Sequence, residues 1–259
     1  MSADLLSKVR KLNWVLQESA TGAFSFNELC GILSDLMDSN VYIINKSDKV
    51  LGVHYKIRSD SSTITDPETG KEKFPNEYNE ALLKIVNTQA NLKGEEALAI
   101  FKYDYDTADK LHTVVPILGG GQRIGTLVLA RYAPEFTDEE LVLSEYGATL
   151  VGLEIQRQKS LEVEEDTRKS TIVQMAIGAL SYSELEAMHR VFQELNGNEG
   201  LLVASKIADR SKITRSVIVS ALRKLESAGV VESRSLGMKG TYIRILNDKF
   251  IECLERFKT

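Results

Sequence analysis

The sequence predicts an α+β protein with two domains joined by a long helix. Helical patterns at both ends of the first 180 residues enclose short β-branched runs, an order typical of an antiparallel sheet with flanking helices. Charge is also distributed unevenly. Residues 200–247 hold nine basic and three acidic residues, although the 259-residue chain has a net charge of −5. A basic segment on an acidic protein is typical of a module that binds a polyanion.

Hydrophobic periodicity predicts the elements of the first domain. Apolar residues at helical spacing predict helices over 4–17, 26–37 and 80–87, with Asn27 as the N-cap of the second. The predicted strands cover 41–44, 50–55, 97–103, 111–118 and 123–130. Gly119-Gly120-Gly121-Gln122 suits a tight hairpin because glycine readily adopts positive φ. The polar segment 58–73, rich in turn residues, predicts a long flexible loop.

A long helix is predicted to follow these strands. Thr137-Asp138-Glu139-Glu140 has the spacing of a capping box, and helical periodicity continues from there to about Leu180. The middle, 156–169, is rich in charged residues, which indicates a solvated helical linker. We therefore expect a first domain over 1–155, a linker helix over 137–182 that overlaps its end, and a second domain over 183–259.

The second domain has the element order of a winged helix-turn-helix. Ser183-Glu184-Leu185-Glu186 is predicted to be a capping box that opens its first helix. A short helix over 202–209 and a turn over 210–213 are expected next. A recognition helix over 215–228 then begins at Thr214 as N-cap and ends before Gly229. Strands over 230–234 and 241–245 flank a glycine-bearing loop, 235–240, which would form the wing.

This motif assigns roles in DNA binding. The start of a recognition helix reaches base edges in the major groove, whereas basic side chains further along and in the wing contact phosphates. The candidate base-reading residues are Thr214, Arg215, Ser216 and Ser220. The candidate phosphate contacts are Arg223, Lys224, Arg234 and Lys239. The alternative is a small helical domain with a solvated basic face. Ser216 is also a candidate phosphorylation site, because a phosphate there would repel DNA.

Several other classes of protein are disfavoured. The three histidines, His54, His112 and His189, lack metal-ligand spacing, and Cys30 and Cys253 lack a nearby second cysteine. No nucleophile–base–acid set stands out, so we expect no catalytic residues, no metal and no enzyme activity. The absence of a long apolar run or signal pattern predicts a cytoplasmic protein with no membrane partner.

Eight segments together carry a resemblance to a known family. They are Ala204–Arg210, Ile213–Val219, Ala221–Gly229, Glu232–Tyr242, Ile117–Gly121, Gly125–Leu127, Glu145–Thr149 and Ser181–Ala187. The chain resembles, over essentially its full length, the CodY global transcriptional regulators of low-GC Gram-positive bacteria. The resemblance implies an N-terminal GAF domain, a winged helix and a homodimer that represses nutrient-limitation genes at AT-rich operators. It implies no cofactor, but branched-chain amino acids, isoleucine above all, and GTP as effectors.

The resemblance also implies site residues. The amino acid would lie against a Phe-Pro-x-x-Tyr segment, matched by Phe74, Pro75 and Tyr78, with Ile100 and Phe101 as a second wall. Ala204, Ser205 and Lys206 would join the DNA-binding residues.

One departure concerns the ligand. Members of the family that bind isoleucine carry an arginine just before the aromatic segment, whereas residues 60–73 here contain neither Arg nor Met. Arg58 or Lys73 could pair with the carboxylate instead. The alternative is a sensor of another small metabolite that acts through protein contacts. No GxxxxGK[ST] phosphate loop is present for GTP.

Overall fold

The computed structural model describes residues 2–19, 24–58, 63–67, 70, 72–102, 109–195, 197–203 and 213–257. The chain divides into two compact units, Met1–Gln158 (unit 1) and Lys159–Thr259 (unit 2). The long helix α5, Asp138–Gly178, contributes its first half to unit 1 and its second half to unit 2. It ends two residues before the predicted limit at Leu180.

Unit 1 is built on a five-stranded antiparallel sheet with the order β2-β1-β7-β6-β5. These strands are β1 Asn40–Asn45, β2 Val50–His54, β5 Gln89–Leu92, β6 Leu111–Gly119 and β7 Gln122–Arg131. Strands β6 and β7 form the predicted hairpin, where Gly120 and Gly121 have φ values of 59° and 74°. The segment predicted as a loop contains two short paired strands, β3 Ile64–Thr65 and β4 Glu72–Lys73.

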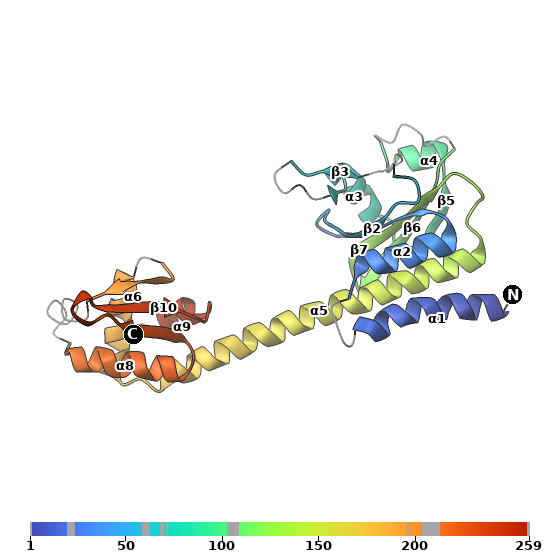
Figure 1. Cartoon of the computed structure of the whole chain (residues 1–259). Helices are drawn as coiled ribbons and strands as arrows, with labels where there is room; N and C mark the ends of the chain where they lie inside the picture. The colour runs from blue at the N-terminus through green and yellow to red at the C-terminus, as the bar shows by residue number, and fades with distance from the viewer. Residues whose placement is uncertain are drawn as a thin grey trace. The chain divides into compact units, whose positions relative to one another are not determined.

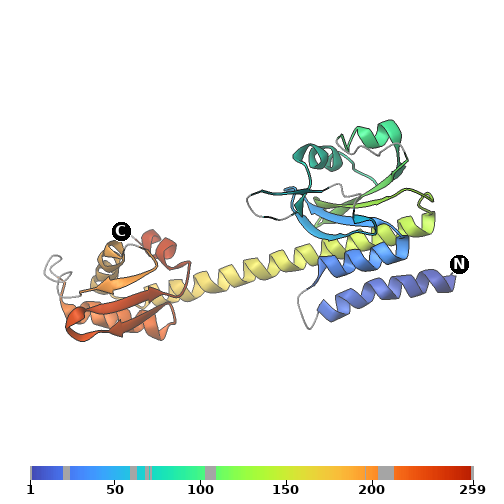
Figure 2. The same ribbon diagram turned by 45° about the horizontal axis from the view of Figure 1, so that its top comes forward.

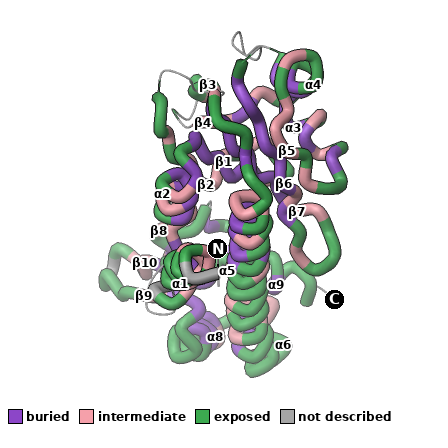
Figure 3. Tube along the Cα trace, turned by 90° about the vertical axis from the view of Figure 1, so that its right-hand side faces the viewer, coloured by how far each residue is buried: buried purple, intermediate pink, exposed green. Residues whose placement is uncertain are grey.

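Helices cover both faces of this sheet (Figures 1 and 2). Helices α1 (Ser2–Ser19), α2 (Phe26–Met37) and the first half of α5 lie on one face, and α3 (Asn76–Leu83) and α4 (Gly94–Leu98) lie on the other. Strand β1 shows the expected alternation: Val41 and Ile43 pack into the first core, and Tyr42 and Ile44 into the second. The burial colouring shows how completely β1, β6 and β7 are enclosed (Figure 3). The predicted α+β class is confirmed.

Three local predictions in unit 1 are wrong. The strand predicted over 97–103 is absent from its described part, 97–102, where the end of α4 and a turn stand instead. An apolar run this short fits either structure, and the preceding Glu95 and Glu96 suit a helix N-terminus. The edge strand is instead β5. The helix predicted over 80–87 begins earlier, with Pro75 as its N-cap. Ser25, not Asn27, caps α2, and Asn27 Oδ1 accepts a hydrogen bond from the Val53 N–H (2.9 Å).

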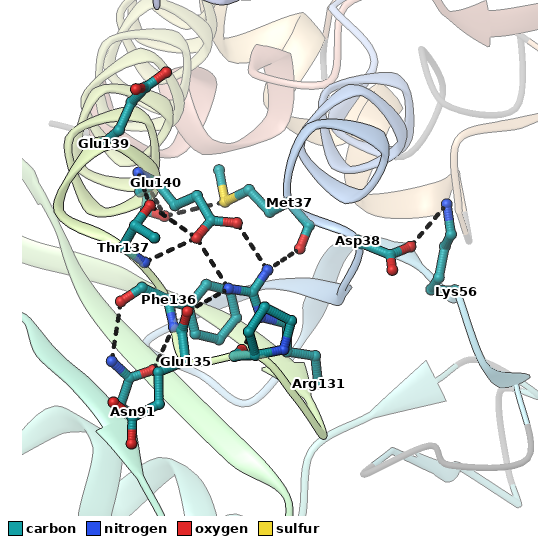
Figure 4. A network of polar contacts seen from close by, with 12 residues as sticks. Met37, Asp38, Lys56, Asn91, Arg131, Glu135, Phe136, Thr137, Glu139 and Glu140 are labelled. Carbon is teal, nitrogen blue, oxygen red and sulfur yellow. Dashed lines mark hydrogen bonds and ion pairs between the residues drawn. The ribbon is translucent and has the colours of Figure 1, made fainter. Parts of the chain in front are cut away.

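A network around Arg131 fixes the start of α5 (Figure 4). The buried guanidinium donates to the Met37 carbonyl at the end of α2 (2.6 Å) and to both carboxylate oxygens of Glu140 (2.7 and 2.9 Å). It also lies 3.9 Å from the centre of the Phe136 ring. The predicted capping box is present, since the Thr137 N–H donates to Glu140 (2.8 Å) and Thr137 Oγ1 accepts from the Glu140 N–H (3.4 Å). The end of β7 thereby ties α2 to α5.

Unit 2 combines helices with a three-stranded antiparallel sheet in the order β8-β10-β9. Its elements after α5 are α6 Tyr182–Glu194, β8 Glu199–Leu202, α8 Arg215–Ser227, β9 Val231–Ser235, the 3₁₀ turn η2 Gly237–Lys239, β10 Thr241–Ile245 and α9 Phe250–Arg256. Leu202 was expected to begin a helix but ends β8, and the sequence pattern did not reveal α9. Residues 204–212, where the rest of that short helix and its turn were expected, lie outside the described residues.

The end of α5 belongs to the core of unit 2. Val173, Ala176 and Ile177 pack with apolar residues of α6, α8 and α9. Two polar contacts hold α5 to the residues before α9: Lys249 Nζ lies 2.8 Å from Asp166 Oδ2, and Asn247 Nδ2 donates to the Lys169 carbonyl (3.1 Å). By contrast, residues 159–164 of the same helix are all exposed, as their charged composition predicted.

Candidate functional sites

Helix α8 is amphipathic, and its buried side sets its orientation. Ile218, Ala221, Leu222 and Leu225 are at most 5% exposed and pack into the core of unit 2. These positions recur at a spacing of three and four residues, as one face of an α-helix requires. The recognition helix predicted over 215–228 is therefore present within one residue. Its other side carries Arg215, Ser216 and Arg223, which are exposed.

A buried carboxylate holds α8 against α6. Glu184 occupies position N3 of α6, where Ser181 is the N-cap and the two residues form a capping box. The same carboxylate accepts hydrogen bonds from Ser220 Oγ (2.7 Å) and Lys224 Nζ (2.8 Å) of α8. Lys224 also donates to the Ala179 carbonyl just after α5 (3.1 Å). A single side chain thus connects the start of α6 with α8, and Lys224 extends the connection to the end of α5.

The electrostatics of Glu184 follow from these contacts. Burial disfavours the charged form, but hydrogen bonds from Lys224, Ser181 and Ser220 outweigh that effect and hold the pKa of Glu184 at about 2. The carboxylate is therefore ionised at neutral pH and strengthens its hydrogen bonds to α8.

Two residues predicted to contact DNA make contacts within unit 2 instead, and one predicted N-cap lies at a different serine. Ser220 and Lys224 were assigned to DNA, yet each donates to Glu184 inside unit 2. The capping box predicted at Ser183 lies two residues earlier, at Ser181, because both serines have a glutamate three residues later. The sequence reasoning missed Glu184 as the residue that positions α8; the Ser181–Glu184 spacing could have indicated its capping role but not its tertiary contacts.

The first turn of α8 is exposed. Thr214 is its N-cap by position but makes no side-chain cap bond, and its hydroxyl lies 2.9 Å from that of Ser216. Among the described residues, neither Arg215 nor Arg223 has an ion-pair partner. The predicted residues Ala204, Ser205 and Lys206 lie outside the described part of the chain.

A groove of about 1030 Å³ runs between α8 and the last turns of α5. Arg215, Ser216, Val219 and Arg223 line it on α8, and Ile172 and Met175 on α5. Its described lining contains no acidic residue. An open cationic groove with an apolar floor can accommodate an extended anionic partner.

The wing follows α8 as predicted, with β9 and β10 as its strands. Arg234 is exposed at its base and pairs with Glu232 (3.0 Å), while Lys239 is exposed in η2 at its tip. Gly240 has a φ of 116°, and a Cβ there would lie 2.5 Å from the Leu202 carbonyl oxygen. Glycine is therefore needed for the loop to return close to β8, and that close approach fixes the wing to the sheet.

The aromatic residues predicted for the sensor site converge in unit 1. Phe74 and Tyr78 have ring centres 6.2 Å apart, and Tyr78 and Phe101 have ring centres 5.5 Å apart, both edge to face. Phe101 stacks on His112 at 4.2 Å. These side chains, which we call the aromatic cluster, are at most 2% exposed and lie between α3, α4 and the sheet. Ile100 joins the same core.

A polar pocket of about 380 Å³ adjoins this cluster. Lys49 and Lys73 line it with the acidic side chains of Asp48, Asp66 and Glu72, and Lys73 pairs with Asp66 at 3.4 Å. The Phe74 N–H donates to the Asp48 carbonyl (3.3 Å), so the pocket lies beside the aromatic segment. Pro75 caps α3 there, whereas Arg58 is exposed and does not line the pocket.

Metal-ligating side chains and membrane-spanning helices were sought in the described part of the chain. No three His, Cys, Asp or Glu side chains gather there in a way that could hold a metal ion. No helix of that part combines the length and hydrophobicity needed to cross a bilayer.

Comparison with known proteins identifies both halves of the chain. A model of the CodY GAF-like domain matches residues 4–179, and a model of the CodY helix-turn-helix domain matches residues 198–258. Relatives named "Global transcriptional regulator CodY" from a Thermoanaerobacter species and from Lysinibacillus sphaericus are 55% and 53% identical. Each alignment covers 98% of this chain and, respectively, 98% and 99% of the relative.

A solved structure supports the same assignment for the first half. The cofactor-binding GAF domain of the nutrient sensor CodY from Clostridium difficile is 49% identical, with a TM-score of 0.50. The match covers 60% of this chain and 99% of that domain. The chain belongs to the CodY family, with a CodY GAF-like domain followed by a CodY helix-turn-helix domain.

Proposed function

We propose that this chain is a transcriptional regulator that binds double-stranded DNA through α8 and the wing, and that small metabolites bound to the GAF domain set its affinity. The observation that carries the proposal is the asymmetry of α8. One side is held by the core and Glu184, and the other exposes Arg215, Ser216 and Arg223 in a groove whose described lining has no acidic residue. The names of the relatives, global transcriptional regulators, agree with this function.

The proposed effectors are branched-chain amino acids, above all isoleucine, and GTP. Phe74, Pro75 and Tyr78 match the aromatic segment of the family, and Ile100 and Phe101 lie in the same core as its rings. The adjoining pocket has charges of both signs, which suits the ammonium and carboxylate of an amino acid. Among the two candidates for the carboxylate partner, Lys73 lines this pocket and Arg58 does not. The proposal that GTP is an effector rests on the resemblance to the family alone.

The proposal includes a homodimer that represses nutrient-limitation genes at AT-rich operators. Residues 1–155 would sense the metabolite, 137–182 would link the domains, and 183–259 would bind DNA. A two-fold dimer would place two winged helices on two half-sites, so we expect the operator to be palindromic.

The test is a fluorescence anisotropy titration of an AT-rich promoter duplex at fixed salt. We expect isoleucine and GTP to lower the Kd for the duplex, and isoleucine to raise the thermal unfolding temperature of the protein. The Lys73→Ala variant should keep its DNA affinity without ligand but require more isoleucine for the same increase. DNA binding unaffected by either effector would contradict control by isoleucine and GTP, and no salt-dependent binding at all would contradict DNA binding.

A second candidate is a sensor of another small metabolite that acts through protein contacts. It is favoured by one observation, the absence of any Arg or Met from residues 60–73. Calorimetry with isoleucine and the polar amino acids distinguishes the two ligand classes, because the mixed-charge pocket would favour a polar side chain under the second candidate.

A further inference from the structure

We propose that Val219 on α8 and Met175 on α5 contact thymine methyl groups, so that the last turns of α5 are part of the DNA interface. The inference rests on the proposed function and assigns to it two base-reading residues, one of them outside the helix-turn-helix. The proposed partner at the groove between α8 and α5 is double-stranded DNA.

The position of Val219 is the first argument. It follows Ser216 by three residues and precedes Arg223 by four, so the three side chains share one side of the helix. The hydroxyl of Ser220, the next residue, donates a hydrogen bond to Glu184. Val219 is therefore the central groove-lining residue of α8, between side chains that can bond to bases and phosphates.

Met175 forms the opposite wall of the groove. Its side chain is 73% exposed, although the neighbouring Val173, Ala176 and Ile177 are buried in the core. Ile172 lies one turn earlier and lines the same wall. An apolar side chain this exposed, on a helix fixed by its other face, is available to a partner that enters the groove.

The positive charge of the groove indicates which kind of partner it binds. Arg215 and Arg223 stand on its α8 side without ion-pair partners among the described residues, and its described lining has no acid. These features favour an anionic partner over a basic or neutral one, and DNA is a polyanion. The major groove presents one apolar group at its base edges, the thymine C5-methyl, which is the group that Val219 and Met175 can contact without leaving a polar atom unpaired.

The expected effects are modest and specific. Burial of one methyl group changes an equilibrium constant by about fourfold. Replacing a contacted thymine by deoxyuridine should therefore weaken binding of the wild-type protein by about fourfold, and replacement of thymines elsewhere should have little effect. Val219→Ala should weaken binding by a similar factor and should itself be tolerated, since alanine is the best helix former.

The experiment uses the full chain and a duplex selected by the wild-type protein from a randomised pool. Each thymine is replaced in turn by deoxyuridine, and Kd values are measured by anisotropy for the wild type, Val219→Ala and Met175→Ala. Leu246→Ala, which changes an exposed apolar side chain of unit 2 outside the groove, is the matched control. We expect the deoxyuridine penalty at one or two positions to disappear in Val219→Ala, with a separate position affected in Met175→Ala.

Each result decides a different claim. Identical deoxyuridine profiles in the wild type and both groove variants would overturn the inference, as would a change in oligomeric state in those variants without a change in profile. In that case, a loss of duplex binding in Arg215→Ala would leave the proposed function intact. If the wild-type protein selects no duplex and shows no salt-dependent binding, the proposed function fails together with the inference.

Discussion

The two candidate sites differ in how their residues are used in this structure. In the aromatic cluster, Phe74, Tyr78 and Phe101 are buried and contact one another. On the outer side of α8, Arg215, Ser216 and Arg223 are exposed and lie along an open groove. A DNA duplex can approach the second site without rearrangement of the helix. A ligand can touch the rings of the first only if it replaces contacts that stabilise the core.

This difference indicates which of the two sites can change conformation when a ligand binds. A ligand that replaces ring contacts changes the packing of α3 and α4. If it binds the repacked conformation of unit 1 more tightly than the one described here, it shifts the equilibrium between the two by that difference in affinity. The site on α8 has no such coupling of its own, because its inner side is fixed by the core and by Glu184. We expect sensing to change the structure of unit 1 and recognition to use α8 as it stands.

The largest expected effect is loss of stability on substitution of Phe74. Phe74→Ala removes a fully buried ring and should lower the free energy of unfolding by about 3–5 kcal/mol. Phe74→Leu, which keeps most of the volume, should cost considerably less. Urea unfolding of the full chain measures both. Equal stability of the wild type and Phe74→Ala would show that the cluster is not a packed core.

Glu184→Gln should produce the next largest effect, because it removes a charge that holds α8. We expect unfolding of unit 2 to be easier by about 1–2 kcal/mol at neutral pH, the low part of the range for charge-assisted bonds since Lys224 is partly exposed. DNA affinity should also fall, although Glu184 points into the domain. Glu186→Gln is the matched control on the same helix.

The effect of Glu184 should depend on pH. Its pKa is about 2 in the folded chain, against 4.5 for an ordinary glutamate, so the stabilisation is fully present above about pH 4.5 and is lost as the pH falls towards 2. The difference in the free energy of unfolding between the wild type and Glu184→Gln, measured by urea titration, should therefore shrink below about pH 4.5 and vanish only as the pH falls through about 2. A difference that does not change with pH would contradict this assignment.

Ser216→Asp should weaken DNA binding about tenfold or more, because it places a negative charge against DNA phosphates at the first turn of α8. Ser216→Ala is expected to have a smaller effect, since it loses only a hydroxyl. Phosphoserine at this position would act as Ser216→Asp does, with more charge. Operator affinity of Ser216→Asp equal to that of the wild type would remove the basis for phosphorylation as a control.

The smallest effect is expected in the wing. Lys239→Ala should reduce affinity by less than tenfold for every sequence alike, and should lower the slope of log K against log salt by about 0.9, as one phosphate contact requires. The same loss restricted to particular sequences would indicate that Lys239 contacts bases instead.

The sequence predicted the elements whose local signals are unambiguous. The Gly120-Gly121 turn, the Thr137–Glu140 cap and α8 each combine a clear periodicity or spacing with a suitable terminal residue. Ambiguity arose where two interpretations fit the same residues. Ser181 and Ser183 both precede a glutamate by three, and the run Ala97–Phe101 is short enough for a strand or a helix.

Contacts between residues far apart in the chain could not be predicted from the sequence. The spacing of Ser220 and Lys224 on α8 suggests a surface stripe, and only the fold reveals that Glu184, 36 and 40 residues earlier, accepts hydrogen bonds from both. The same holds for the groove, which pairs α8 with Met175 of α5. The resemblance to the family predicted the convergence of Phe74 and Tyr78, but not that Phe101 would stack on His112.

The most direct test of the account is the salt dependence of duplex binding by the wild type, Arg215→Ala and the control Arg190→Ala. Arg190 is exposed but pairs with Glu186 on α6, away from the groove. We predict that Arg215→Ala weakens binding by about 5- to 150-fold and relaxes the preference for one base pair, while Arg190→Ala binds as the wild type does. Equal affinity and equal sequence preference in all three proteins would contradict recognition of DNA through α8.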